Sequence, residues 1–598
     1  MTTAIAPPDV APYSWLVPPS DEEKLQYLCA PQHRWIFIVS ATAFAGVAAS
    51  LAGFATQSYW TAVFLLPLAL LVVEQLISLR TSTLRRRVTL PDHQFLVETY
   101  APARYPSVDV FLPSAGEDVE LLENTYRHVA RLHWPGTLTV NVLDDVGNPT
   151  VAELATEYGF RYLARPGSEF KKAGNLHYAY TRTSGEFILI LDADFVPRPE
   201  FLLETVPYFE QESVGVVQSP QYFSTSRSMS WLERCAGATQ ELFFRHIQPS
   251  RDAVAAAICV GTSAVYRRAA LQTIGGFPLI GHSEDVFTGV LLGRQGYRVQ
   301  YVPVVLSRGR CPDEIGAFLA QQYRWCEGSM ALIADRRFHE DTSMTGMQRL
   351  SFWAGFLYYV TTAVMAVLAP LPVLVMVTFF PANIDIMNML PLLGVVVLWL
   401  VVFPAVSLSH WRIEVLRVQT LYGFAHLFSM LDAARGKVME WVATGAGSAP
   451  RRTVAHRVQR FMVPYLAVTQ MLVFAGLLHG AMEYGVLRYS FNIAFALLGA
   501  YVFLPVVWLG RGAFVPASRP AGRHARGTDT ERAIPPTAKV IDLPPQQPVG
   551  RHAAADARRT DSERAIPPTA KVIDLRSRRP VGRHVARVAS ETAEARGA

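Results

Sequence analysis

The chain carries little charge for its length. Asp, Glu, Lys and Arg make up 17% of its 598 residues and hydrophobic residues make up 51%, whereas roughly 25% charged residues is usual for soluble domains. The mean hydropathy is +0.19. This shortage of charge argues against a protein that is soluble throughout and predicts a membrane component. Buried core helices of a soluble protein are the alternative explanation for its apolar runs.

Cysteine is scarce, and glycine-rich phosphate loops are missing. The cysteines are odd in number and lack metal-ligand spacing, which argues against a disulfide framework or a cysteine metal site and suits reduced thiols in the cytoplasm. Neither Gly-x4-Gly-Lys-Ser/Thr nor Gly-x-Gly-x-x-Gly after the first predicted strand occurs. A bound nucleotide would therefore be held by carboxylates, a metal and side chains. The five cysteines are Cys29, Cys235, Cys259, Cys311 and Cys326.

Basic charge is concentrated at the end of the chain. The net charge is +6, but the excess of Lys and Arg lies from Arg511 onward, so nucleic acid is not an expected partner. Within this tail, residues 531–543 are repeated without change at 563–575. Because the tail is rich in Pro, Arg and Ala and lacks spaced apolar residues, we predict a disordered basic segment over 511–598. Such a tail could contact anionic membrane lipids.

Six apolar runs are long enough to cross a membrane. Basic residues lie beside their ends, at 80, 85–87 and 451–460, whereas segment 55–59 has none. The positive-inside rule therefore places both termini and residues 81–350 in the cytoplasm of a multi-pass cell-membrane protein. The predicted spans are 35–54, 60–79, 350–380 (one long or Pro-kinked span), 387–408, 462–481 and 490–509.

These features divide the chain into five predicted parts. A cytoplasmic N-terminal segment (1–34) is followed by two transmembrane helices (35–80). A cytoplasmic domain (81–350) comes next, followed by transmembrane helices with interfacial helices (351–510) and the tail (511–598).

Residues 107–345 alternate strand-like and helix-like stretches. The alternation predicts an α/β domain with a mostly parallel sheet that is covered by helices on both faces. Ligands of such sheets bind beyond the carboxyl ends of the strands. The predicted strands are 108–112, 137–143, 161–164, 187–191 and 215–218, with a helix at 119–132.

Carboxylates follow three of these predicted strands. Glu117 follows the first, Asp144 the second, and Asp192 and Asp194 the strand at 187–191. Burying an unpaired carboxylate is costly, so the natural partner of Asp192 and Asp194 is a hard divalent cation, Mg²⁺ or Mn²⁺, that also binds substrate phosphates. Acids at successive strand ends suit an enzyme that binds the base, ribose and pyrophosphate of a nucleotide sugar.

Two later motifs also suit sugar-transfer chemistry. Asp285, in Ser-Glu-Asp, could deprotonate an acceptor hydroxyl. Within Gln321-Gln-Tyr-Arg-Trp, Arg324 offers a planar fork for a diphosphate, and Trp325 offers a flat face for a sugar ring. Structural roles stay open: a turn for Asp144, a helix N-terminal acid for Asp285, core or membrane-interface packing for Trp325, and a solvated pair for Lys171 and Lys172.

The motif order Asp-Asp, Asp-x-Asp, Glu-Asp, Gln-x-x-Arg-Trp resembles the processive membrane synthases of glycosyltransferase family 2, especially the catalytic subunit of bacterial cellulose synthase. The resemblance runs from about residue 105 to 510 and includes Lys172-Ala-Gly-Asn-Leu and the stretches 108–117 and 188–194. It implies a GT-A-like α/β domain inserted in an α-helical bundle of about six transmembrane spans.

The resemblance also implies a metal site, a donor site and an acceptor site. By this similarity, Asp192 and Asp194 would bind the metal, with Asp192 also contacting the donor diphosphate. Asp285 would be the general base. Asp144, Lys172 and Glu117 would bind the donor, with Asp144 at the uridine, and Gln321, Arg324 and Trp325 would hold the diphosphate and the acceptor end of the glycan.

Three departures from the family pattern stand out. Phe195 occupies the position of a His that can contact the metal in the relatives. The gating-loop pattern Phe-x-Val-Thr-x-Lys survives only as Trp441-Val-Ala443-Thr444-Gly-Ala446. The signatures of a cyclic di-GMP-binding barrel do not occur together in the tail.

The implied activity is inverting transfer from a UDP-α-sugar, UDP-glucose first among them, to an acceptor hydroxyl. The product would be a β-linked polysaccharide that the protein moves across the membrane. Alternatives are a non-processive transferase that adds one sugar to a lipid or membrane acceptor, and a non-catalytic scaffold or transporter. The sugar and the linkage stay open. Expected partners are the UDP-sugar, the growing glycan and membrane lipids, and they could include accessory export proteins.

Overall fold

We describe the protein from a computed structural model, which covers residue 13 and residues 15–223, 225–226, 229–281, 283–436 and 454–511. The chain divides into two units, Met1–Ala517 and Ser518–Ala598. The second unit, with most of the predicted tail, and the gating-loop stretch at 441–446 lie outside the described residues. The fold below is that of the first unit.

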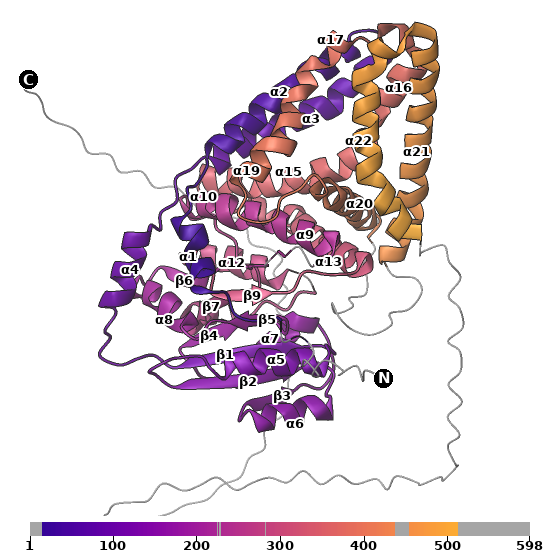
Figure 1. The fold of residues 1–598 in the computed structure, drawn as a ribbon. Coiled ribbons are helices and arrows are strands. Elements are labelled where there is room, and N and C mark those ends of the chain that lie inside the picture. Colours follow the sequence, from indigo (N-terminus) through magenta and orange to yellow (C-terminus); the bar gives the residue numbers. More distant parts are fainter. Residues whose placement is uncertain are drawn as a thin grey trace, which may run out of the picture. The chain divides into compact units, whose positions relative to one another are not determined.

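A seven-stranded sheet forms the centre of the soluble part (Figure 1). Its strand order is β3-β2-β1-β4-β7-β6-β8. Only β7 runs antiparallel to its neighbours β4 and β6, so the predicted mostly parallel sheet is confirmed. The strands are β1 (Val108–Ser114), β2 (Leu138–Asp144), β3 (Arg161–Ala164), β4 (Phe187–Ile190), β6 (Val214–Gln218), β7 (Ala264–Arg267) and β8 (Arg298–Tyr301).

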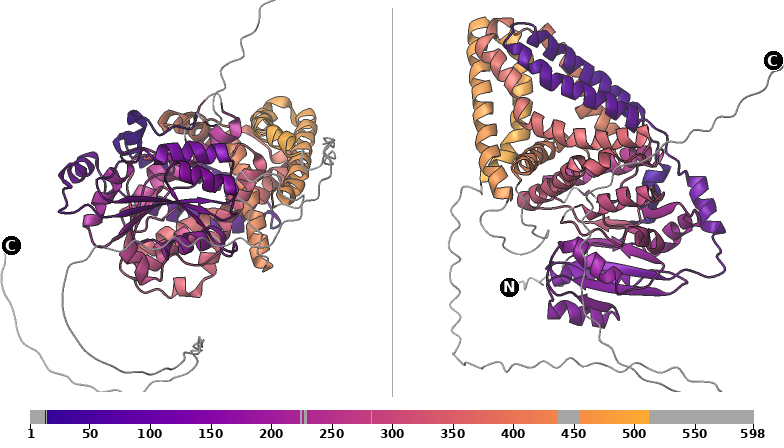
Figure 2. Two further views of the ribbon diagram at one scale, coloured as in Figure 1. Left: turned by 90° about the horizontal axis from the view of Figure 1, so that it is seen from below. Right: turned by 180° about the vertical axis from the view of Figure 1, so that it is seen from behind.

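Helices cover both faces of this sheet (Figure 2), which explains why the central strand β4 is apolar and buried along its whole length. Leu189 of β4 packs into one core, with Leu122 of α5 (Val119–Val129). Ile188 and Ile190 pack into the other, with Leu176 of α7 (Lys171–Tyr180). Successive side chains of a strand point to opposite faces, so one short strand contributes to both cores.

Smaller elements complete the soluble part. β5 (Phe195–Pro197) and β9 (Ser307–Gly309) form a separate two-stranded antiparallel sheet. The helices are α1 (Asp21–Cys29), α4 (Leu90–Thr99), α6 (Pro149–Glu157), α8 (Phe201–Thr205), α9 (Trp231–Glu241), α10 (Gln248–Asp252), α11 (Arg268–Thr273), α12 (Glu284–Arg294), α13 (Ile315–Ala334) and α14 (Arg336–His339).

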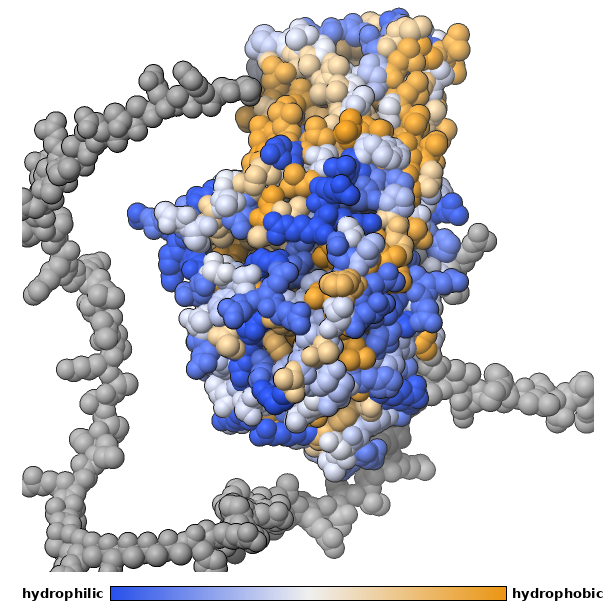
Figure 3. All heavy atoms as spheres, turned by 90° about the vertical axis from the view of Figure 1, so that its left-hand side faces the viewer, coloured by the Kyte–Doolittle hydropathy of each residue, from blue (hydrophilic) through white to orange (hydrophobic). Residues whose placement is uncertain are grey.

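Six helical segments among the described residues are long and apolar enough to span a membrane, as predicted. Hydrophobic side chains cover the surface over them, and hydrophilic ones cover the part built around the sheet (Figure 3). The third span consists of α15 (Gly346–Leu368) and α16 (Leu371–Phe379), which meet at Pro370, because proline removes a helical hydrogen bond. The spans are Trp35–Ala55 (α2), Thr61–Ser82 (with α3, Leu65–Ser82), Gly346–Phe379, Ile386–Val406, Val454–Tyr484 (α21) and Val486–Gly510 (α22).

Three helices lie between the sheet and the spans (Figure 1): α9, α13 and α20 (Val415–Ala434). The Gln-x-x-Arg-Trp helix α13 packs against α15, α20 and α21. The sheet is therefore joined to the membrane helices through the helix that carries this motif. All five cysteines are free, as expected.

Candidate functional site

The candidate residues gather at the carboxyl ends of β1, β2 and β4. Lys172, in the first turn of α7, forms an ion pair with Asp192, and its Nζ donates to the Gly261 carbonyl at 2.9 Å. The Asp192 backbone N–H donates to Thr262 Oγ at 2.9 Å. A Cβ at Gly261 would lie 2.8 Å from Asp285 Oδ2, which places Asp285 directly against the same loop. Residues distant in the sequence thus form one site.

Lys172 keeps its positive charge although it is half-buried. Burial lowers its pKa, but the carboxylates of Asp192, Glu284 and Asp285 outweigh this effect and raise the pKa above the usual value for lysine. Phe170 and Lys171, just before it, adopt left-handed conformations with φ of 55° and 50°. A fixed cation that faces three acids at a strand edge is suited to binding a phosphate group.

Asp194 and Glu117 add two half-buried acids to the site. Burial, followed by the charges of Asp192 and Glu117, raises the pKa of Asp194 to about 7. Burial likewise raises the pKa of Glu117, whose Oε2 accepts a hydrogen bond from the Ala115 N–H at 2.6 Å. A cation among such clustered acids lowers the free-energy cost of their ionised forms.

The carboxylate oxygens of the site fit a hard divalent cation whose coordination shell is completed by the substrate. No group of three or more His, Cys, Asp or Glu in the described part of the chain is arranged to hold a metal. Mg²⁺ is commonly bound by one or two carboxylates together with substrate phosphates. That Asp192 and Asp194 would supply such a pair of oxygen ligands stays a prediction.

The structure explains why Phe195 does not join this donor set. Phe195 lies on β5 opposite Gly309 of β9 and is only 4% exposed. Its ring packs edge-on against Phe223, with the centroids 5.6 Å apart. A Cβ at Gly309 would lie 2.3 Å from the ring. The side chain is therefore part of a hydrophobic core and is held there by a close backbone approach.

Asp144 forms the turn that the sequence left open as an alternative. Its carboxylate accepts hydrogen bonds from the Val146 N–H at 2.9 Å, the Asn148 N–H at 2.7 Å and the Tyr162 hydroxyl at 2.8 Å. The next residue, Asp145, pairs with Arg165 at 2.5 Å. The donor-binding role of Asp144 stays a prediction, and this network gives the carboxylate a structural role as well.

Glu284 and Asp285 begin α12. Burial, followed by the charge of Glu284, raises the pKa of Asp285 to about 7. Burial also raises the pKa of Glu284. Ser283, immediately before them, has a left-handed backbone with φ of 51°. A half-buried carboxyl with a pKa near neutrality can accept a proton at physiological pH.

Gln321, Arg324 and Trp325 share one face of α13, because they lie three and four residues apart. Burial lowers the pKa of Arg324 to about 10, against the opposing charges of Glu327 and Asp192. Arg324 therefore stays charged and is close enough to Asp192 to interact with it electrostatically. This places the motif at the side of the acid cluster that faces the membrane helices.

A glycine allows α13 to approach the Ser-Glu-Asp motif. A Cβ at Gly328 would lie 1.7 Å from Ser283 Oγ and 2.3 Å from Ser283 Cβ. We expect Gly328→Ala to displace the start of α12 and with it Asp285, lowering the catalytic rate about 100-fold, as misplacement of a reacting group by about 1 Å can do. Initial rates on the purified variant measure this.

Gly316→Ala on the same helix is the matched control. Its Cβ would meet only the Cβ of Ala455, at 3.8 Å, an ordinary contact. Its activity should stay at the wild-type level. Equal rates for the two variants would contradict the proposed link between α13 and Asp285.

Several residues of the site were not predicted as site residues. Gly261 and Thr262 anchor Lys172 and Asp192, and Glu284 perturbs Asp285. The signal that could have identified Gly261 and Thr262 is the Cys259-Val-Gly-Thr-Ser263 stretch, which has no periodic apolar pattern yet leads directly into the buried strand β7. Arg165 was missed for a different reason, since its partner Asp145 is twenty residues away in the sequence.

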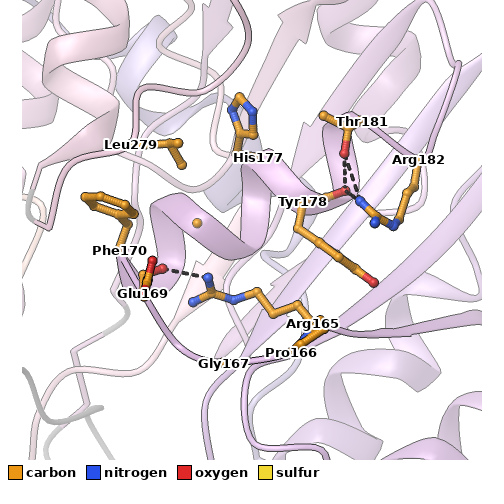
Figure 4. A pocket seen from close by; sticks show the side chains of 11 residues that line it. Arg165, Pro166, Gly167, Glu169, Phe170, His177, Tyr178, Thr181, Arg182 and Leu279 are labelled. Carbon is orange, nitrogen blue, oxygen red and sulfur yellow. Dashed lines mark hydrogen bonds between the residues drawn. The ribbon is translucent and has the colours of Figure 1, made fainter. Parts of the chain in front are cut away.

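A cavity of about 470 Å³ lies on the outer side of α7 (Figure 4). Phe170, His177, Tyr178 and Leu279 are among its lining residues, together with Arg165, which pairs with Asp145. The Nδ1–H of His177 is bonded to the Phe277 carbonyl at 2.8 Å, and Arg182 stacks on the Tyr178 ring at 3.6 Å. The carboxylates of the candidate site do not line this cavity.

Comparisons with known proteins agree with the motif order. Residues 187–411 match the family described as Glycosyl transferase family group 2. Cellulose synthase 1 of Komagataeibacter xylinus is 32% identical over 238 residues, covering 39% of this chain and 15% of that protein. The UDP-forming cellulose synthase catalytic subunit of Xanthomonas axonopodis pv. citri is 31% identical over 255 residues, covering 42% and 34%. The resemblance to family 2 glycosyltransferases of the cellulose synthase type is therefore confirmed.

Two limits apply to these similarities. The chain spans no more than about a third of the length of these two relatives. Among solved structures, the mannosyltransferase PcManGT from Pyrobaculum calidifontis, in complex with GDP-Man and Mn²⁺, is 16% identical with a TM-score of 0.43, covering 67% of this chain and 100% of that one. The fold assignment therefore depends on the sheet topology itself.

Proposed function

We propose that this chain, whose residues 187–411 match family 2 glycosyltransferases, is an inverting membrane enzyme that polymerises a nucleotide-activated sugar, UDP-glucose first among the candidates, into a β-linked polysaccharide and moves it across the membrane. The observation that carries the proposal is the convergence of Lys172, Asp192 and Asp285 on the Gly261 loop. That loop lies beside the helix that joins the sheet to the membrane spans.

The donor half of the site is suited to a nucleoside diphosphate. Lys172 and Arg324 both stay positively charged and both lie near Asp192. We assign to them the two phosphates of the donor. Asp192 and Asp194 would hold Mg²⁺ or Mn²⁺, which when bound offsets the charge of the departing UDP. Asp144 and Glu117 would bind the rest of the donor, with Asp144 at the uridine.

The acceptor half needs a base, and Asp285 supplies it. Its carboxylate takes the proton from the acceptor hydroxyl as that oxygen attacks the anomeric carbon from the face opposite the diphosphate. The bond from the anomeric carbon to the diphosphate oxygen breaks, and UDP leaves with the electron pair. Attack from the opposite face inverts the α-linkage to β. Gln321 and Trp325 are assigned to the acceptor end of the glycan.

The activity should fall as the pH drops below about 7. The pKa of Asp285 is raised to about 7 by burial and by Glu284, and only its ionised form can accept a proton. We therefore expect kcat/KM to fall about tenfold per pH unit on the acid side. Glu284→Gln removes a like charge, which should lower the pKa of Asp285 and move the acid limb of the kcat/KM profile to lower pH.

The Glu284→Gln variant also distinguishes titration of Asp285 from titration of Asp194. The pKa of Asp194 is also raised to about 7, but by burial, Asp192 and Glu117. Removing the charge of Glu284 should therefore leave the pKa of Asp194 in place. pH profiles of kcat/KM for the wild type and Glu284→Gln measure the shift. A limb that stays in place in the variant would mean that a different group controls it.

Contacts of α13 support processive synthesis over single transfer. The helix packs against α15, α20 and α21, so an acceptor that lies along Trp325 is already beside the membrane bundle. The same arrangement and the basic residues beside the spans support a cytoplasmic sheet domain and export through the bundle. Such export could involve accessory proteins.

The test is incubation of the purified full chain with a panel of radiolabelled UDP- and GDP-sugars, followed by sizing and linkage analysis of the product. A long β-linked polymer from one donor is the expected result. A product that carries a single added sugar would overturn the polymerase proposal in favour of single transfer to a membrane acceptor. No transfer from any donor would favour a non-catalytic protein.

A further inference from the structure

A second cavity lies at the level where the chain leaves the membrane. It has a volume of about 260 Å³ and is lined by Arg234 of α9 and by His410, Arg412 and Glu414. The last three belong to the segment between the span Ile386–Val406 and α20. His410 follows the end of that span by four residues, which limits its distance from the span end to about 14 Å. The cavity thus lies in the headgroup region or just below it.

The segment that lines this cavity is fixed by hydrogen bonds to α9 and to Thr225. Glu241, in the last turn of α9, accepts hydrogen bonds from the Leu408 N–H at 2.9 Å and from the N–H and hydroxyl of Ser409 at 2.7 and 2.6 Å. The His410 N–H donates to Thr225 Oγ at 3.2 Å. The segment that carries His410 and Arg412 is therefore anchored on α9, beside Arg234.

The charge of the cavity is predominantly positive. Glu414 is its one acid, and its carboxylate already accepts a hydrogen bond from the Tyr501 hydroxyl at 2.7 Å. Burial would raise the pKa of Glu414, but this hydrogen bond and the charges of Arg417 and Arg234 hold it below the usual range. The side chains of His410 and Arg412 are exposed at the cavity. An anion would meet two guanidinium groups and an imidazole there.

Two aromatic side chains of the kind that mark a membrane interface lie beside residues that line the cavity. Tyr501 donates to Glu414, and Trp231 precedes Arg234 on α9. Arg417 stacks between the rings of Trp231 and Tyr501, at 5.4 and 4.8 Å from their centroids. This aromatic pair favours an anion that is part of the membrane over one that diffuses in the cytoplasm.

We propose that Arg234, His410 and Arg412 bind the phosphate group of an anionic phospholipid. The diester phosphate accepts hydrogen bonds from the guanidinium groups, and the acyl chains extend along the adjacent spans. Because the segment 407–414 leads directly into α20, which packs against α13, an occupied site would hold the helix that carries Gln321 and Arg324. The site lies outside the proposed catalytic machinery and does not depend on it.

The test compares lipid binding by the full chain with and without these charges. The Arg234→Ala/Arg412→Ala variant and the wild type are reconstituted in nanodiscs of phosphatidylcholine with graded phosphatidylglycerol, and retained phosphatidylglycerol is counted by native mass spectrometry after transfer to detergent. We expect the wild type to retain a tightly bound phosphatidylglycerol and the variant to bind it at least tenfold more weakly. Equal retention would overturn the proposal.

Two further arms make the result specific. Arg336→Ala/Arg337→Ala removes the same charge from side chains that are 88% and 84% exposed on α14, and it should retain lipid like the wild type. Arg412→Glu changes only an exposed side chain, so it tests the site without disturbing packing, and it should lose the lipid. Millimolar inorganic phosphate should not displace phosphatidylglycerol. If it does, the site binds a soluble phosphate and the lipid assignment is wrong.

Discussion

Replacement of Asp285 by Asn is expected to lower kcat for sugar transfer by about 10²–10⁴-fold, the contribution of a positioned general base. The substitution preserves the size of the side chain. The amide oxygen can still accept the hydrogen bond from the Val286 N–H, which lies 2.8 Å from Oδ1 in the native protein. What is lost is the capacity to take a proton from the acceptor. Lys172 and Arg324 are untouched, so the affinity for UDP should remain.

Initial rates with the accepted sugar donor, together with calorimetric titration of UDP, separate these two effects. Glu340→Gln is the matched control, because it is the same carboxylate-to-amide change at a side chain that is 57% exposed directly after α14. That variant should transfer sugar at the wild-type rate. An Asp285→Asn protein that binds UDP and transfers at the wild-type rate would show that another group accepts the proton.

The strands that carry the site were predictable because each is a buried apolar run bounded by turn residues. The predicted strand at 108–112 became Val108–Ser114 and that at 161–164 was reproduced. Strand β7 (Ala264–Arg267) was not predicted, and neither were β5, β8 and β9. The antiparallel direction of β7 depends on pairing with β4 and β6, which lie far away in the sequence.

The acids of the site were predictable from local sequence, but their surroundings were not. A carboxylate at the end of a buried strand is conspicuous because it needs a partner. The partner of Asp192 in the structure is Lys172, which lies on a different element twenty residues earlier. The contact of Gly328 with Ser283 depends on how α13 packs on α12. No local pattern specifies such a contact, since it exists only once both helices are in place.

Asp194→Asn is expected to abolish donor-dependent cation binding and to lower kcat/KM by about 10²–10³-fold, since charge stabilisation by a bound metal supplies several kcal/mol. The pKa of Asp194 is raised to about 7 by burial and by Asp192 and Glu117. Its ionised form is thus unfavourable unless a positive charge compensates it, which is the environment that favours a divalent ion. The neutral amide removes that requirement and one of two proposed ligands. Phe195 cannot replace it, because its ring is packed between Gly309 and Phe223.

Electron paramagnetic resonance of Mn²⁺ titrated into the protein with UDP measures this effect independently of turnover. The wild type should immobilise Mn²⁺ in a UDP-dependent way, and Asp194→Asn should leave it free. Asp313→Asn serves as the control, because Asp313 pairs with Arg310 and its side chain is 48% exposed. If Asp194→Asn bound Mn²⁺ and UDP as tightly as the wild type, the cation would have to be held by other oxygens of the cluster. Glu117 is the nearest candidate, since its charge already perturbs Asp194.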